Sequence, residues 1–105
     1  MQTKSKLATY IGFSIRSGKI LYGYENIIAA RKKVYLILLD EETGESTKKK
    51  ITSYAVKNAV NIYVLLSGEL FAYCGGKNVK CLGLTDINLA LAAENELKTN
   101  IGGNN

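Results

Sequence analysis

Cations that stand beside glycines are the residues of this chain best suited to chemistry. Two basic triplets occupy residues 31–33 and 48–50, and Gly-Lys pairs occur at 18–19 and 76–77. Glycine lets a backbone approach a ligand closely, and lysine neutralises a phosphate. The pattern therefore indicates binding of an anion rather than catalysis.

Residues for acid–base, nucleophilic or metal chemistry are scarce. The chain has no histidine, and its densest group of carboxylates falls in one predicted turn, at residues 40–45. Its two cysteines, Cys74 and Cys81, are too few for a zinc site, and we expect two small buried side chains. We expect no enzymatic activity, no metal and no cofactor.

Composition and charge favour a small nucleic-acid-binding domain. The 105 residues carry a net charge of +5, and 47% of them are hydrophobic. A basic surface attracts a polyanion over long distances. We expect one folded domain over residues 1–99, a flexible tail over residues 100–105, a cytoplasmic location and no membrane partner, because no apolar run is long enough to span a bilayer.

Helical and strand patterns alternate along the chain. Apolar residues recur at intervals of four in the first segment, as Leu7, Ile11 and Ile15 show, and residues 34–39 form a continuous apolar run typical of a buried strand. The predicted helices cover residues 4–17, 24–32, 47–58, 69–74 and 86–97, and the predicted strands cover 20–22, 34–39, 61–66 and 79–85. This alternation predicts an α/β/α sandwich whose sheet is covered on both faces.

Each basic triplet has two interpretations, one structural and one functional. Residues 31–33 fall at the predicted end of the second helix, where cations interact favourably with the helix dipole, so they can be structural or can contact an anion. Residues 48–50 fall at the predicted start of the third helix, where cations are mildly unfavourable. They are either a solvated face or an anion contact.

Two further segments are candidate binding sites. Gly23, Tyr24, Glu25 and Asn26 open the second predicted helix, where free amides suit a phosphate and polar side chains can read base edges; the alternative is an ordinary helix start. The second segment, residues 68–78, has aromatic residues, two glycines and Lys77. It suits an unstacked RNA base, and the alternative is a helix end at Gly75.

The order and spacing of five local signatures resemble those of one known family. The signatures are R-S-G-K-I at 16–20, G-Y-E at 23–25, the apolar strand at 34–39, S-T-K-K-K at 46–50 and E-L-F-A-Y-C-G-G-K at 69–77. Together they resemble the kink-turn-binding ribosomal protein family (the L-seven-Ae superfamily), and above all its bacterial YlxQ and YbxF branch.

The resemblance implies a three-layer α/β/α sandwich around a four-stranded mixed sheet. It also implies binding to kink-turn RNA, an internal loop with a sharp bend and tandem sheared G·A pairs, within the ribosome. We expect no binding to DNA. Under the resemblance, residues 23–26 face the G·A pairs, Lys19 and Lys33 lie near phosphates, and a lid over an extruded base is formed by Leu70, Tyr73, Cys74 and Gly75, with Lys77 beside it.

The chain departs from the family pattern at several of these positions. Glu25-Asn26 reverses the family's Asn-Glu pair, Ala29 replaces a helix lysine, and the aromatic residues Phe71 and Tyr73 replace a lid glycine and alanine. An alternative prediction is a protein-interaction or self-assembling module that has lost kink-turn binding, with Tyr24, Phe71 and Tyr73 as an apolar contact.

Overall fold

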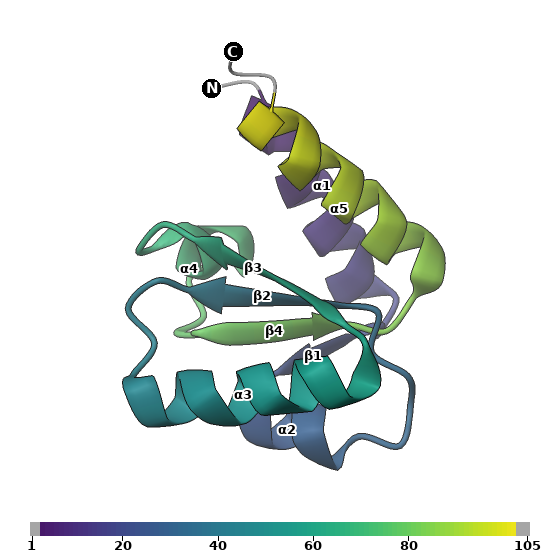
Figure 1. The fold of residues 1–105 in the computed structure, drawn as a ribbon. Helices are drawn as coiled ribbons and strands as arrows, with labels where there is room; N and C mark the ends of the chain where they lie inside the picture. Colours follow the sequence, from purple (N-terminus) through teal and green to yellow (C-terminus); the bar gives the residue numbers. More distant parts are fainter. Residues whose placement is uncertain (1–2, 103–105) are drawn as a thin grey trace.

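A four-stranded mixed sheet separates two layers of helices (Figure 1). The computed structural model describes residues 3–102. The strands are β1 (Ile20–Tyr22), β2 (Leu36–Asp40), β3 (Asn61–Leu65) and β4 (Cys81–Leu84), in the spatial order β1-β4-β2-β3. β4 runs antiparallel to both β1 and β2, and β2 runs parallel to β3. All five residues of β2 are buried, as expected for a central strand.

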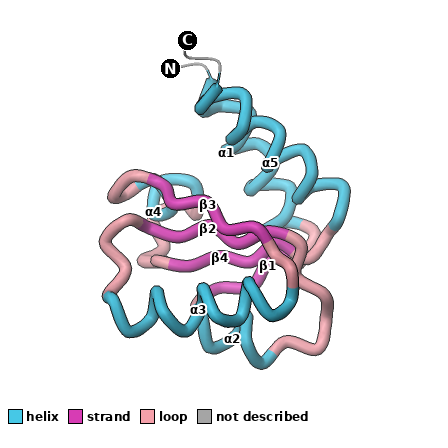
Figure 2. Tube along the Cα trace, in the orientation of Figure 1, coloured by secondary structure: helices cyan, strands magenta, loops and turns pink. Residues whose placement is uncertain are grey.

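The helices cover both faces of the sheet and confirm the predicted three-layer architecture. Figures 1 and 2 show α1 (Thr3–Arg16), α4 (Glu69–Tyr73) and α5 (Ile87–Gly102) on one face, and α2 (Tyr24–Ala29) and α3 (Glu45–Asn58) on the other. Each face has its own core. Leu7 and Ile11 of α1 pack into the first with Leu36 and Leu38, whereas Ile37 and Leu39 point into the second.

Local signals explain where several elements begin. The Asp86 side chain accepts a hydrogen bond from the Leu89 backbone N–H (2.9 Å), which caps the start of α5 as predicted. β1 coincides with its prediction, and α1 is shifted by one residue at each end. No helix within residues 3–102 is long and apolar enough to cross a membrane.

The buried Asp40 side chain, at the end of β2, fixes the two turns beside it. Its Oδ1 accepts a hydrogen bond from the Glu42 backbone N–H (2.7 Å), and its Oδ2 accepts one from the Gly68 N–H (3.2 Å). The Thr43 hydroxyl also donates to the Asp40 carbonyl oxygen (2.7 Å). A buried carboxyl needs such partners, so it sets the path into α3 and the position at which α4 begins.

Three helix boundaries differ from the sequence prediction by two residues or more. α2 ends at Ala29 because Ala30 is extended (ψ 140°) and the chain turns away to bury Val34, so residues 31–33 lie in a loop. The helix-dipole explanation for that triplet is therefore wrong. α3 begins earlier than predicted, at Glu45, so residues 48–50 lie beyond its first three positions. α5 continues to Gly102, so the predicted tail is helical over residues 100–102 and otherwise lies outside the described residues.

Gly83 in β4 allows α2 to pack closely on the sheet. A Cβ atom at this position would lie 3.0 Å from Ile27 Cγ1 and 3.2 Å from Val34 Cγ1. Both neighbours are buried, so they have little room to move.

We expect Gly83→Ala to lower the free energy of unfolding by about 1–3 kcal/mol, the usual cost of overpacking a core. Urea denaturation measures this change. The matched control is Gly12→Ala within α1, where the new Cβ would lie at an ordinary distance of 3.6 Å from Arg16 Nη1. That variant should gain about 0.5–1 kcal/mol from helix propensity. Equal effects of the two substitutions would contradict the packing argument.

Candidate nucleic-acid interface

The junction between β1 and α2 presents the predicted groove-reading residues at one end of the sheet. Gly23 has a φ of 87°, which favours glycine, and its N–H donates to the Cys81 carbonyl oxygen (2.8 Å). The Asn26 amide nitrogen donates to the Tyr22 carbonyl oxygen (2.7 Å). Glu25 and Asn26 are exposed, so the first turn of α2 presents both side chains to solvent.

The loop that follows α4 lies beside this junction. Gly75 and Gly76 have positive φ angles of 67° and 89°, and the Gly76 N–H donates to the Phe71 carbonyl oxygen (2.9 Å), which ends the helix. The Lys77 ammonium lies 4.3 Å from the centroid of the Tyr22 ring, within the range of a cation–π contact. Two predicted segments that are far apart in the sequence are thus brought together.

Cys74 provides a neutral surface at this contact. Burial raises the pKa of its thiol, although the nearby Lys77 lowers it in part. Burial also raises the pKa of the Tyr22 hydroxyl, and the electrostatic effect of Cys74 raises it further. Both groups are therefore uncharged near pH 7, and the positive charge at the junction comes from Lys77.

The predicted lid is only partly available to a ligand. Leu70 is completely buried in the core beneath α4, so its predicted role as part of the lid surface is wrong. A motif match does not show which side of a five-residue helix faces the sheet. Phe71, with an exposed fraction of 50%, is the α4 aromatic residue that faces solvent.

Tyr73 is turned toward the core rather than outward. Its ring packs against the same core, and its hydroxyl is buried with no hydrogen-bond partner among the described residues. Burial, with a smaller effect of Glu69, raises the pKa of Tyr73 to about 12. Cys74 and Gly75 remain as the accessible part of the predicted lid.

Lys19 and Lys33 lie at the opposite end of β1 and β4 from the β1–α2 junction. The Lys19 carbonyl oxygen accepts a hydrogen bond from the Thr85 N–H (3.1 Å), and the Tyr35 N–H donates to the Leu84 carbonyl oxygen (2.8 Å). A three-residue strand spans about 10 Å, which separates these lysines from the first turn of α2. The predicted site residues therefore form two groups, at opposite ends of β1 and β4.

Two aromatic–cation contacts at the interface were not anticipated from the sequence. Besides the Lys77–Tyr22 contact, the Lys50 ammonium lies 5.5 Å from the Tyr24 ring centroid, which brings the second basic triplet to α2. Tyr22 could have been suspected because it directly precedes the Gly-Tyr-Glu signature. No local signal connects Lys50 with Tyr24.

The chemistry available here is contact with an anion and with polar base edges. No group of three or more His, Cys, Asp or Glu side chains within residues 3–102 could hold a metal ion. The interface instead combines exposed acceptors at Glu25 and Asn26 with the cations Lys50 and Lys77. Such a combination is typical of a surface that positions a phosphate backbone and reads a few base edges.

Comparison with known proteins defines the structural class of the chain. No family model matches the sequence, and no curated protein matches it. Among solved structures, the chain is similar to a protein with unknown function from Bacillus halodurans C. The match has a TM-score of 0.81 and 21% identity, and it covers 89% of this chain and 97% of that chain. The two proteins share a fold, and the similarity assigns no ligand.

The buried Tyr73 hydroxyl makes stability depend on pH under alkaline conditions. Because the folded state holds the pKa of Tyr73 at about 12, above the ordinary value of 10.0, folding favours the protonated form. The contribution of the protonated Tyr73 hydroxyl to folding stability is complete below pH 10 and is lost as the pH rises toward 12. We expect Tyr73→Phe to lose less stability than the wild type between pH 10 and 12, as measured by urea denaturation.

At pH 7 the same substitution should leave stability unchanged or raise it by about 1 kcal/mol, because it removes a buried hydroxyl without a partner. Parallel pH profiles for Tyr73→Phe and the wild type would show that this hydroxyl is not buried in solution.

Proposed function

We propose that this protein is a non-enzymatic RNA-binding protein of the cytoplasm that binds kink-turn or other structured RNA in the ribosome or its assembly. The observation that carries the proposal is the meeting of the α2 first turn with the loop after α4, joined by the Lys77–Tyr22 contact. These are the two segments that the resemblance to the kink-turn-binding family assigns to RNA.

Acceptor groups on α2 suit the sheared G·A pairs of a kink-turn. The Asn26 amide nitrogen is bound to the Tyr22 carbonyl oxygen, so its Oδ1 is left to face a ligand, and Glu25 adds a carboxylate. The guanine amino group is a hydrogen-bond donor in the minor groove. Because both side chains on this exposed turn are acceptors, either order of the two residues can read the guanine amino group. The reversed Glu25-Asn26 sequence is therefore compatible with this role.

The remaining residues suit the backbone and the extruded base. Gly75 has no side chain, and the neutral Cys74 thiol offers a small apolar surface on which an unstacked base can rest. Lys77 supplies a charge beside that surface, while Lys19 and Lys33 supply charges at the other end of β1. RNA bound at the first turn of α2 can extend along this side of the protein to reach both.

Selectivity for a kink-turn is the direct test. The wild-type protein should bind a standard kink-turn RNA more tightly than a matched RNA without the G·A pairs, at two salt concentrations. Equal, weak and salt-sensitive binding to both RNAs would contradict the proposal and would indicate only a generic basic surface.

The phosphate contacts can be tested one at a time by alanine substitution. Lys19→Ala, Lys33→Ala and Lys77→Ala should each weaken kink-turn binding, and each should reduce the slope of log K against log salt concentration by about 1, because one phosphate contact is lost. Filter binding over a salt series measures the slope. The control is Lys98→Ala on α5, in the helical layer away from α2, where an unchanged slope is expected. A slope unchanged in all three test variants would contradict their role.

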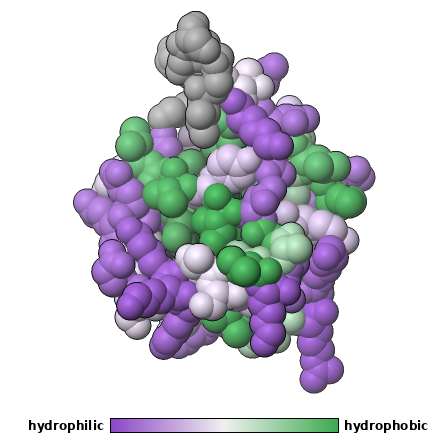
Figure 3. Space-filling view, in the orientation of Figure 1, coloured by the Kyte–Doolittle hydropathy of each residue, from purple (hydrophilic) through white to green (hydrophobic). Residues whose placement is uncertain are grey.

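A second candidate function, contact with a protein partner or self-assembly, is favoured by one observation. β3 is an edge strand, and the exposed fractions of Val64 within it and of Leu66 directly after it are 58% and 60%. Figure 3 shows a hydrophobic area across this face of the molecule, bordered by hydrophilic side chains. Concentration-dependent oligomers in light scattering that persist at high salt would favour this function.

A further inference from the structure

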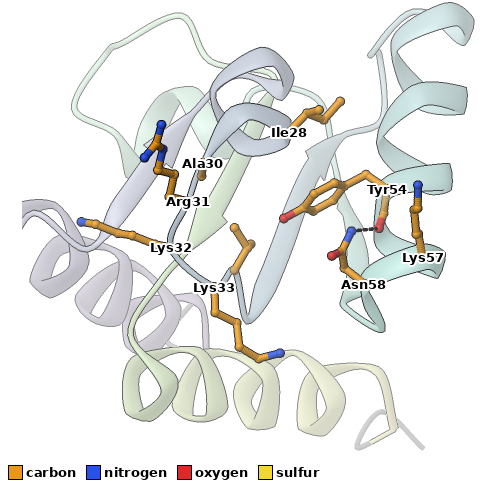
Figure 4. A pocket seen from close by; sticks show the side chains of 9 residues that line it. Ile28, Ala30, Arg31, Lys32, Lys33, Tyr54, Lys57 and Asn58 are labelled. Carbon is orange, nitrogen blue, oxygen red and sulfur yellow. Dashed lines mark hydrogen bonds between the residues drawn. The ribbon is translucent and has the colours of Figure 1, made fainter.

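A hollow of about 580 Å³ lies between the loop after α2 and the end of α3. Its walls are residues 30–34 of the loop and Ile28 on one side, and Tyr54, Lys57 and Asn58 of α3 on the other (Figure 4). We call this space the basic hollow. It lies at the far end of α2 from the turn that carries Glu25 and Asn26, so it is separate from the groove-reading surface.

Positive charge dominates the basic hollow. Four of its lining residues are cations, namely Arg31, Lys32, Lys33 and Lys57, and none is acidic. The salt bridge between Lys80 and Glu42 (4.0 Å) involves none of them, and none of them has a carboxylate partner among the described residues. Figure 4 shows the Arg31 and Lys32 side chains extending away from Tyr54, so their charged ends must turn toward the space to contact an anion between the loop and α3.

The fold does not explain this clustering of cations. The loop leaves α2 at Ala30, so residues 31–33 gain little from the dipole of a helix that has already ended. Only Lys57 lies in the last turn of a helix. The C-terminus of α3 contributes about half a negative charge at the hollow, which disfavours an anion, but four full positive charges outweigh it.

The uncharged residues that line the hollow suit an aromatic ring attached to that anion. Figure 4 shows the Tyr54 side chain extending from α3 into the space toward the loop, with Ile28 above it. The Asn58 side-chain amide nitrogen donates a hydrogen bond to the Tyr54 carbonyl oxygen (2.9 Å). The Asn58 side-chain oxygen is therefore able to accept a hydrogen bond from a base. The hollow falls within the range of about 300–1,000 Å³ typical of small-ligand sites.

We propose that the basic hollow is a nucleotide-binding site, in which the loop cations and Lys57 hold the phosphate and Tyr54 stacks on the base. The ligand is either a free nucleotide or one nucleotide of an RNA strand, since both present the same phosphate and ring. The site shares Lys33 with the proposed kink-turn surface, but it does not depend on RNA binding at the β1–α2 junction.

The test is an NMR titration of the ¹⁵N-labelled protein with adenosine monophosphate, inorganic phosphate and a tetranucleotide RNA at constant ionic strength. Adenosine monophosphate should shift the amide signals of Lys32, Tyr54 and Asn58 and should bind at least about tenfold more tightly than phosphate, because base–aromatic stacking supplies that difference. Tighter binding of the tetranucleotide would identify an RNA strand as the source, and tighter binding of the mononucleotide would identify a free nucleotide.

Three variants separate the parts of the proposed site. Tyr54→Leu should reduce the affinity for adenosine monophosphate to that for phosphate, and Lys57→Ala should weaken both. Lys49→Ala, at the other end of the same helix, is the matched control and should change neither. Lys32→Ala, in the exposed loop, provides a second test of the phosphate contact if Tyr54→Leu does not fold.

The proposal is overturned if adenosine monophosphate binds no more tightly than phosphate, or if the shifts lie outside the hollow. It is also overturned if Lys49→Ala weakens binding as much as Lys57→Ala does. None of these measurements uses a kink-turn RNA, so failure here leaves the proposed function untouched.

Discussion

The buried carboxyl of Asp40 is the constraint on which the arrangement of this protein depends. It lies at the end of the fully buried β2 strand, and its oxygens accept hydrogen bonds from two segments that leave the sheet in different directions. Burying a carboxyl without such partners would cost several kcal/mol. Because one of the donors is the Gly68 N–H, directly before α4, the same group fixes the short helix whose following loop reaches the β1–α2 junction. The β1–α2 junction lies at the same end of the sheet, because Leu39 of β2 pairs with Cys81 and the Gly23 N–H donates to the Cys81 carbonyl oxygen. A polar contact in the core thereby determines the geometry of the surface at that end.

Aromatic rings hold several of the cations in place. Lys33, Lys50 and Lys77 lie 5.6, 5.5 and 4.3 Å from the centroids of tyrosine rings. A carboxylate partner would neutralise a lysine, whereas a ring orients it and leaves its charge intact. With 14 basic and 9 acidic residues, the chain keeps a surplus of positive charge on its surface. The tyrosines thus give direction to cations that remain available to an anionic partner.

The sequence was sufficient to predict most of the fold because the local signals agree with the tertiary structure. The apolar run of β2, the period-four stripe of α1 and the Asp86 cap each depend on residues close together in the chain. The end of α2 was mispredicted because residues 30–32 are compatible with a helix, and only the burial of Val34 pulls the chain away from it. The burial of Leu70, the reach of Lys50 to Tyr24 and the basic hollow also depend on contacts between distant segments, which no local pattern reports.

The pairing of α1 with α5 has a practical consequence for the handling of this molecule. Thr3 at the start of α1 and Gly102 at the end of α5 lie at the same tip of this helix pair, on the face of the sheet away from α2 and α3 (Figure 1). A dye, an affinity tag or a sensor surface attached through either end is therefore held at a distance from the first turn of α2 and from the basic hollow. Immobilisation through one end leaves both surfaces open to solvent.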